Sequence, residues 1–222
     1  MQKDKREAQL SSFCPDHWLY RLLRRIIFRL FPPVFRVLYG WRICGEIPEE
    51  AVRQGGVSVC NHIHTLDCIM MAYLWKDYFV QFLTLASNLR IPVAGPIVKL
   101  MGGIPLPESI DGWKPVYQRV EKAFSEGQIL QIYPEGELIG GCRQLRPFRP
   151  GAFTFAVKYK KPVIPCVLRF YPRFRKNGVR RKDGMELVIL PPVYPPSERS
   201  GKAAAKALLE EVRERMEEAL NG

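Results

Sequence analysis

The 222-residue sequence lacks several patterns that mark large classes of enzyme. It has only three histidines and no H-E-x-x-H segment, which disfavours a zinc hydrolase, because a catalytic zinc takes three protein ligands. It has no G-x-S-x-G segment, the elbow that presents a nucleophilic serine in many hydrolases. Its six cysteines include no C-x-x-C pair, so we expect reduced, mostly buried thiols rather than a disulfide framework.

Long apolar runs are also missing. No stretch of about 18 uncharged apolar residues occurs, so a membrane-spanning helix is not expected. The nearest candidate, residues 18–31, contains four arginines, and it lacks the small-residue cleavage site of a signal peptide. Together with the basic arm and the family resemblance described below, these absences lead us to expect a peripheral or monotopic protein on the cytoplasmic side of a membrane.

Acidic residues are scarce. The chain has 34 Lys and Arg against 22 Asp and Glu, a formal net charge of +12. Residues 143–182 contain no acid at all, and aromatic residues interleave their cations, which indicates part of the core with basic edges. Such a surplus predicts a polyanionic partner, which composition alone leaves open between nucleic acid, an anionic bilayer and a phosphorylated substrate.

The first 40 residues predict a helical arm. Leu and Ile recur at three- and four-residue steps between residues 19 and 30, with arginines on the opposite arc and Phe28 interrupting that arc. Pro32-Pro33 is expected to end this helix, and residues 34–39 to form a second, shorter one. A basic amphipathic helix suits an anionic membrane surface. The alternative is a helix that packs on its own domain with exposed arginines.

From Gly56 onward, short runs of Val, Ile and aromatic residues alternate with helical patterns. We expect strands at residues 57–60, 78–85, 128–133, 163–170 and 186–190. We expect helices at residues 67–76, 92–101, 113–125, 151–159 and 202–220. This alternation predicts an α/β fold with a mainly parallel sheet flanked by helices. The predicted organisation is an N-terminal amphipathic, interfacial arm (residues 1–40) and one domain (residues 41–222).

His62 is the main candidate for chemistry. It follows an expected strand, and ligands of open α/β sheets bind where strands end. Asp67 can hold one imidazole nitrogen, which leaves the other free to accept a proton. One alternative is that the histidine caps the next helix. Another is that His62, His64 and Asp67 belong to a metal cluster. The small number of histidines disfavours a metal site, and we predict no metal ligands. Without a serine in a similar context, the proton should come from a substrate.

Five sequence segments strengthen this interpretation. In chain order they are Asn61-His62-x-x-x-x-Asp67, Gly102-Gly103-Ile104, Tyr133-Pro134-Glu135-Gly136, the segment from Pro147 to Phe153, and Lys161-Pro162-Val163-Ile164-Pro165. Together they resemble the ordered motifs of the glycerophospholipid acyltransferase family, which is also called lysophosphatidic acid acyltransferase-like. The resemblance covers roughly residues 41–195.

The resemblance implies an O-acyltransferase of phospholipid biosynthesis that needs no cofactor and forms no covalent acyl-enzyme. A fatty acyl group would pass from acyl-CoA or an acyl carrier protein to the hydroxyl of a lysophospholipid or related lipid alcohol. His62 would be the general base and Asp67 its orienting partner. The residues expected to bind substrate are Asn61, Gly103, Ile104, Tyr133, Pro134, Glu135, Gly136 and Arg149. The expected partners are these two substrates and an anionic membrane surface, with no nucleic acid. Two rival functions stay open: a non-catalytic basic module that binds lipid or nucleic acid, and a metal-dependent hydrolase.

Two departures from the family motifs concern the acceptor. Arginines that the family is thought to use on the acceptor's phosphate are replaced at Glu108 and at Glu137-Leu138. Because carboxylates repel phosphate, we expect an acceptor with a neutral, zwitterionic or amine-bearing head. The alternative is that other cations bind the phosphate: Lys99, Arg143, Arg146 or Arg149. Backbone N–H groups near His62, or in the loops at Gly102, Gly103 and Gly136, are expected to stabilise the oxyanion.

Overall fold

The computed structural model describes residues 18–92, 95–96, 98, 102–107, 109, 112–175 and 178–222, without the side chains of residues 19–21. Several sequence-based expectations lie outside these residues. They are the first part of the N-terminal arm, most of the helix expected at residues 92–101, Lys99 and Glu108.

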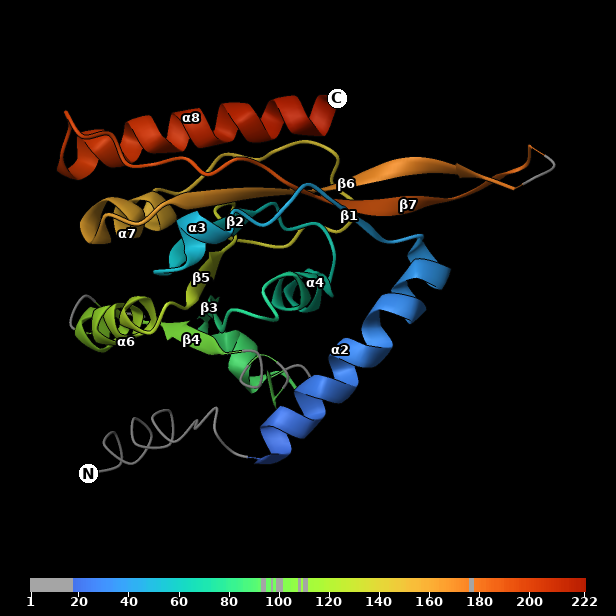
Figure 1. Ribbon diagram of the computed structural model, residues 1–222, viewed down its shortest axis with the longest axis horizontal. Coiled ribbons are helices and arrows are strands. Elements are labelled where there is room, and N and C mark those ends of the chain that lie inside the picture. The colour runs from blue at the N-terminus through green and yellow to red at the C-terminus, as the bar shows by residue number, and fades with distance from the viewer. Residues whose placement is uncertain are drawn as a thin grey trace.

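A seven-stranded sheet in the order β1-β7-β6-β2-β5-β3-β4 forms the centre of the fold (Figure 1). In chain order the strands are β1 (Arg42–Cys44), β2 (Gly56–Cys60), β3 (Val80–Leu85), β4 (Gly103–Leu106), β5 (Ile129–Ile132), β6 (Val163–Phe174) and β7 (Arg180–Ile189). The five strands from β6 to β4 run parallel, whereas β7 is antiparallel to β6 and parallel to β1. The predicted α/β fold with a mainly parallel sheet is confirmed.

Helices cover both faces of the sheet. They are α2 (Trp18–Tyr39), α3 (Glu49–Val52), α4 (Asp67–Leu74), the 3-10 helix η1 (Ala86–Arg90), α6 (Trp113–Ser125), α7 (Gly151–Tyr159) and α8 (Gly201–Asn221). Side chains alternate between the faces of a strand, so Val57 and Val59 of β2 pack with α6, α7 and α8, while Cys60 packs with α2 and α4. All five residues of β2 are buried, which explains why the strand contains no charged residue and has Ser58 as its one hydroxyl-bearing residue.

Several elements differ from the sequence-based expectation. The strands β1 and β4, the short helix α3 and the 3-10 helix η1 were not predicted, because three to five residues carry too little periodicity to be recognised. The hairpin strands are longer than predicted: β6 continues to Phe174 and β7 already begins at Arg180. The residues added to β6 are half-buried or exposed, and those added to β7 begin with four charged residues, so no alternating buried face marks them in the sequence.

The predicted break at Pro32-Pro33 is wrong, because α2 continues through both prolines to Tyr39 (Figure 1). Each proline removes one backbone N–H from the helix. Packing compensates: Phe31 and Phe35 are buried, with ring centroids 4.2 Å apart, and Phe31 also contacts Trp41 at 5.0 Å. Tertiary contacts on both sides of the prolines thus hold one continuous helix.

The outward surface of α2 carries the aliphatic stripe predicted from the sequence. Its exposed apolar side chains are Trp18, Leu22, Leu23, Ile26, Leu30, Val34, Val37 and Leu38. Phe28 lies next to Arg24 on the helix, as expected, and faces the body, where its ring lies edge-on to Tyr73 and under the Arg24 guanidinium. Among the described residues, no helix is both long and apolar enough to cross a membrane.

Candidate active site

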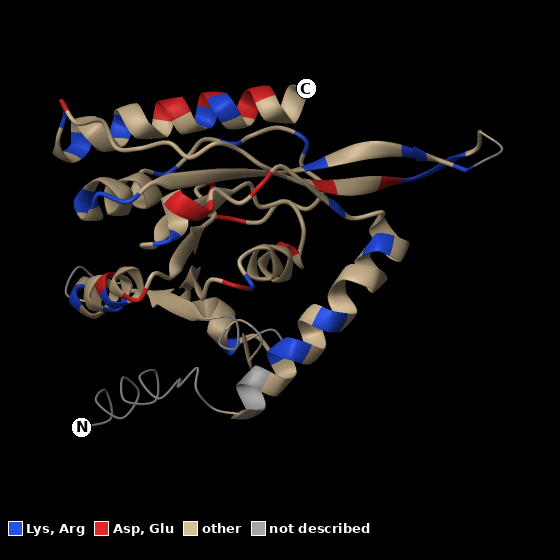
Figure 2. Ribbon diagram, in the orientation of Figure 1, with Lys and Arg blue, Asp and Glu red and all other residues tan. Residues whose placement is uncertain are grey.

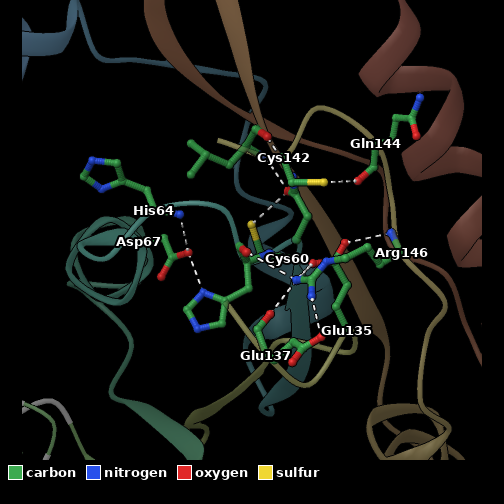
Figure 3. Close-up of polar contacts among 11 residues, drawn as sticks. Cys60, His64, Asp67, Glu135, Glu137, Cys142, Gln144 and Arg146 are labelled. Carbon is green, nitrogen blue, oxygen red and sulfur yellow. Dashed lines mark hydrogen bonds and ion pairs between the residues drawn. The ribbon is translucent and has the colours of Figure 1, made fainter. Parts of the chain in front are cut away.

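His62 and Asp67 meet at the end of β2. His62 lies in the loop after this strand, and Asp67 is the first residue of α4, where the helix dipole favours a carboxylate. Nδ1 of His62 lies 2.6 Å from Oδ2 of Asp67, and the His64 backbone N–H donates to the same oxygen at 3.3 Å (Figure 3). Only 1% of the Asp67 side chain is exposed, against 18% for His62.

This geometry selects a state of the imidazole ring. A carboxylate at Nδ1 favours the tautomer that donates from Nδ1, which leaves Nε2 as the proton acceptor. Within the described part of the chain, Nε2 of His62 has no hydrogen-bond partner. This arrangement is chemically able to act as a general base, with Nε2 as the atom that accepts the proton.

Tyr133 packs flat against His62. The ring centroids lie 4.0 Å apart with an angle of 14° between the planes, and Tyr133 directly follows β5, the neighbour of β2 in the sheet. Burial raises the pKa of the Tyr133 hydroxyl well above its usual value, and the negative charge of Asp67 adds to this effect. Tyr133 therefore stays neutral and acts as a wall that fixes the plane of the imidazole.

Glu135 and Arg146 brace the loop that carries His62. The fully buried Glu135 carboxylate accepts the His62 backbone N–H at 3.0 Å, the Arg146 backbone N–H at 3.1 Å and the Arg146 guanidinium at 2.6 Å. The same guanidinium donates to the backbone carbonyls of His62 and Glu137 (Figure 3). Arg146 is therefore committed to Glu135 and to the loop backbone, a role that its position in the sequence did not reveal.

Arg149 and Glu137 lie on either side of Gly136. Gly136 has a φ of +82°, and a Cβ at this position would lie 2.7 Å from Nε of Arg149, so only glycine lets the guanidinium cross here. The Arg149 backbone N–H donates to the Pro134 carbonyl, whereas its side chain has no acidic partner in the residues that the structure describes. The Glu137 side chain is 70% exposed and lies 3.5 Å from Arg146.

Asn61 has a structural partner. Its side-chain amide donates to the Leu168 carbonyl at 2.8 Å and accepts the Leu168 backbone N–H at 2.7 Å. These two bonds tie the end of β2 to β6 and leave Asn61 buried. Asn61 was expected to bind substrate, but the structure instead gives its amide the task of positioning the strand that presents His62.

The second motif lies away from this cluster. Gly103 and Ile104 are buried in β4, at the edge of the sheet and three strands from β2. At about 4.8 Å per strand, this separation is about 14 Å. The structure does not bring them to His62, and a contact with substrate stays a prediction. Of the backbone N–H groups expected to stabilise an oxyanion, those of His62 and Gly136 are already bonded, to Glu135 and to the Tyr133 carbonyl.

His64 links the site to α2. Its ring packs edge-on against Tyr39, with centroids 5.2 Å apart, and its Nδ1 accepts the Leu66 backbone N–H. Burial lowers the pKa of His64, which favours the neutral ring that this hydrogen bond requires. In Figure 3 the His64 ring points away from Asp67, so His64 joins the loop that carries His62 to the helix.

The cysteines near the site are poor nucleophiles. The five described cysteines are free, with Cys60 and Cys166 buried and the others half-buried, whereas Cys14 lies outside the described residues. Burial raises the pKa of Cys68, next to Asp67, to about 12, and that of Cys60 also lies well above its usual value. Both remain protonated near neutral pH. No group of three or more potential metal ligands occurs among the described residues.

Sequence comparisons agree with this geometry. A family model described as "Acyltransferase" matches residues 42–169. The chain is 30% identical over 173 residues to a chloroplastic 1-acyl-sn-glycerol-3-phosphate acyltransferase, BAT2, of Brassica napus, covering 74% of this chain and 46% of that protein. It is 26% identical over 221 residues to a 1-acyl-sn-glycerol-3-phosphate acyltransferase of Saccharomyces cerevisiae, covering 95% of this chain and 70% of that protein. The chain thus spans about half the length of the plant relative.

A solved structure shares the fold. The 1-acyl-sn-glycerophosphate acyltransferase PlsC of Thermotoga maritima superimposes with a TM-score of 0.61 at 18% sequence identity, over 90% of this chain and 80% of that chain. At this identity the match concerns the fold alone. It covers most of the chain and is independent of the sequence motifs.

Proposed function

The chain belongs to the acyltransferase family, and we propose that it transfers a fatty acyl group from a thioester to the hydroxyl of a glycerol-3-phosphate-based lipid. The observation that carries this proposal is the 2.6 Å contact between His62 Nδ1 and Asp67 Oδ2, which leaves Nε2 open on a half-buried ring. The names of the relatives support the class of acceptor. The donor is acyl-CoA or an acyl carrier protein, and assaying both would separate them.

In the proposed reaction, Nε2 of His62 takes the proton of the lipid hydroxyl while its oxygen attacks the thioester carbonyl carbon. The tetrahedral intermediate then expels the thiolate, which recovers the proton from His62 and leaves as a thiol. Asp67 stabilises the transient imidazolium through Nδ1–H. Positioned proton transfer of this kind contributes about 10²–10⁴ in rate. The protonated thiols of Cys60 and Cys68 favour this direct transfer over a covalent acyl-enzyme.

The charges around Gly136 support a choice of acceptor head group. Two of the candidate cations are neutralised, since Arg143 pairs with Asp183 at 2.6 Å and Arg146 with Glu135. Of the candidate cations that the structure describes, Arg149 remains, and one guanidinium matches the single charge of a phosphodiester better than a dianionic phosphate monoester. The exposed Glu137 carboxylate beside it suits an amine. We therefore propose a zwitterionic lysophospholipid as the acceptor.

An acceptor panel tests this proposal. Purified protein would receive labelled acyl thioester and either lysophosphatidylethanolamine, lysophosphatidic acid or monoacylglycerol in non-ionic detergent. We expect the fastest transfer to lysophosphatidylethanolamine, and we expect Arg149→Ala to lower kcat/KM for it by about tenfold or more. Arg143→Ala is the matched control. Its kcat/KM should stay within about twofold of the wild type, because the charge of Arg143 is already paired with Asp183 of β7. Faster transfer to lysophosphatidic acid, or a harmless Arg149→Ala, would reject the proposed head group.

We also propose that α2 docks on an anionic membrane surface. Its outward face combines exposed aliphatic residues with Arg25, Arg29 and Arg36, all of which are exposed (Figure 2). This combination is typical of helices that lie in the plane of a bilayer interface. Because His64 packs on Tyr39 of the same helix, docking would bring the His62 loop close to the lipids that carry the substrate.

A further inference from the structure

The strands β6 and β7 extend beyond the body of the protein as a two-stranded hairpin (Figure 1). β6 is buried from Val163 to Leu168, and its remaining residues are half-buried or exposed. The pairing of β6 with β7 continues outward to Phe174 and Arg180, with a register irregularity after Tyr171. A two-stranded ribbon is only marginally stable in water by itself, so its length is not explained by the core of the domain.

The outer part of this hairpin is basic and has an exposed aromatic residue at its end. We call residues 173–175 and 178–182 the hairpin tip. The Phe174 side chain is 62% exposed, and Val179 is exposed across the ribbon. The tip has five cations, namely Arg173, Arg175, Arg180, Arg181 and Lys182, and no acid. The first acid that follows, Asp183, is bonded to Arg143 and Arg180.

One explanation of the cations is that they prevent aggregation, as charged residues on exposed edge strands do. That explanation fits the arginines, but it does not fit a large exposed phenylalanine among them. Basic residues around an exposed aromatic side chain are the pattern expected of an element that meets an anionic interface, where the ring enters the head-group region and the cations bind lipid charges.

The inner part of the hairpin is fastened to the end of α2. The Tyr171 hydroxyl donates to the Gly40 carbonyl at 2.5 Å, directly after the last residue of the helix. The Lys182 ammonium lies 5.4 Å from the centre of the Tyr39 ring. Gly40 has a φ of +57°, and the Arg173 guanidinium crosses it where a Cβ would stand. These contacts fix the direction of the hairpin relative to the helix.

Helix α2 and the hairpin leave the body from the same corner and frame one side of the molecule (Figure 1). Lys and Arg lie along both of them, while α8 lies on the far side of the sheet (Figure 2). Two rigidly connected elements with exposed apolar residues and cations could therefore touch the same surface at separate points.

We propose that the hairpin tip is a second contact with an anionic lipid surface and that, together with α2, it sets the orientation of the protein on the bilayer. This inference rests on the proposed docking of α2. Two separated contacts define a tilt that one helix lying on a surface leaves free. The tip therefore contributes to binding strength through its cations and to orientation through its distance from the helix.

Binding to phosphatidylcholine vesicles that contain phosphatidylglycerol tests the proposal. The hairpin variant combines Phe174→Ser, Arg175→Gln and Arg181→Gln. The matched control combines Tyr194→Ser, Lys202→Gln and Lys206→Gln; it also removes one exposed aromatic residue and two cations, but near the start of α8. Tyr194 is 59% exposed and follows Val193, which pairs with the first residue of β6, at the opposite end of that strand.

We expect the hairpin variant to bind these vesicles about tenfold more weakly, because it loses two cations and an aromatic ring at the proposed contact. The control should bind like the wild type, because its cations lie far from that contact and salt screens charges beyond about 10 Å. Phe174→Trp should add an indole emission that brominated lipid quenches. Tyr194→Trp should add an emission that brominated lipid does not quench. Equal binding by the two triple variants, or no added quenching for Phe174→Trp, would overturn the proposal. A hairpin variant that binds vesicles normally but no longer binds duplex oligonucleotide would also overturn the proposal and assign the tip to nucleic acid. A hairpin variant that binds vesicles normally but no longer self-associates would assign the tip to a second copy of the chain.

The proposed function fails separately from this inference. Acyl transfer in non-ionic detergent needs no anionic surface, so both triple variants should keep the wild-type rate there. A wild type that transfers no acyl group in detergent would reject the proposed function, while the vesicle measurements would still decide the role of the tip.

Discussion

At the scale of single residues, His62 is held by two neighbours that act on different parts of its ring. Asp67 bonds Nδ1 at 2.6 Å, and Tyr133 covers one face of the ring at a centroid distance of 4.0 Å. The first contact sets the tautomer and the second sets the plane, so the position of Nε2 depends on both. The sequence predicted Asp67 from its spacing, whereas a stack between residues 71 positions apart leaves no local pattern.

Tyr133 gives a prediction at this scale. Tyr133→Phe should keep kcat within about twofold, because the stacked ring remains. Tyr133→Ala should lower kcat by about tenfold or more, since the imidazole loses the wall that orients it. Steady-state kinetics in detergent would measure both, with circular dichroism to confirm folding. Equal activity of the two variants would contradict a positioning role for the ring.

Residue motifs and residue roles were not equally predictable. The order of the motifs singled out His62, Asp67 and Glu135, and the structure brings these three residues together at the ends of β2 and β5. Arg146 was expected to be a candidate for phosphate binding, yet it pairs with Glu135. The sequence could not show this pairing, because two residues in one irregular loop follow no fixed spacing.

At the scale of elements, α2 presents two apolar surfaces with different tasks. Phe31 and Phe35 face the body and are buried, whereas Ile26 and Leu30 point away from it and are exposed. The sequence showed the aliphatic stripe but suggested a break at Pro32-Pro33. It missed the aromatic stripe, because a helix with an apolar side toward the protein and another toward the outside shows no clean polar arc.

The two surfaces of α2 can be separated by mutation. Phe31→Ala should destabilise the fold by about 3 kcal/mol, because it leaves a cavity among buried aromatic rings. The pair Ile26→Ser and Leu30→Ser should change the free energy of unfolding by less than about 1 kcal/mol, since both side chains are already exposed. The same pair should weaken vesicle binding severalfold. Urea denaturation and vesicle sedimentation would measure the two effects; a pair that unfolds easily but binds normally would place these residues in the core.

At the scale of the whole molecule, Glu186 connects the outer strands to the C-terminal helix. Its buried carboxylate accepts hydrogen bonds from Arg42 of β1 at 2.5 Å, from Arg169 of β6 at 2.8 Å and from the Cys44 thiol at 3.0 Å. Arg169 also donates to the Ala219 carbonyl of α8. Burial by itself would raise the pKa of Glu186, but the hydrogen bonds from Cys44, Arg169 and Arg42 outweigh it and hold the pKa below its usual value.

This network predicts how stability depends on pH. A carboxylate with a lowered pKa in the folded state stabilises the protein above the unfolded value of about 4.3, and this contribution is lost as the pH falls through the folded pKa. Glu186→Gln should therefore cost about 1–2 kcal/mol at neutral pH, because a buried amide replaces the carboxylate that pairs with the half-exposed side chains of Arg42 and Arg169. The difference from wild type should shrink below about pH 4. Denaturation at several pH values would test this, and a difference independent of pH would contradict it.

The fold class followed from the sequence more securely than the extent of its elements. Helices α6 and α7 have the predicted bounds, because each has a clear apolar face. The length of the β6–β7 hairpin was not predictable, since pairing between its exposed residues depends only on the partner strand. The basic segment was expected to be partly core with basic edges. It contributes the buried Phe153 to the core, and it ends in a basic hairpin that carries the exposed Phe174.

The most direct test of this account is the rate of acyl transfer by purified His62→Ala, Asp67→Asn and His64→Ala proteins. We predict that His62→Ala lowers kcat by about 10³ or more without unfolding the protein, because proton transfer is the task of this ring. Asp67→Asn should also lose most activity, and His64→Ala should lose much less. If folded His62→Ala keeps the turnover of the wild type, His62 is not the base and the proposed mechanism is wrong.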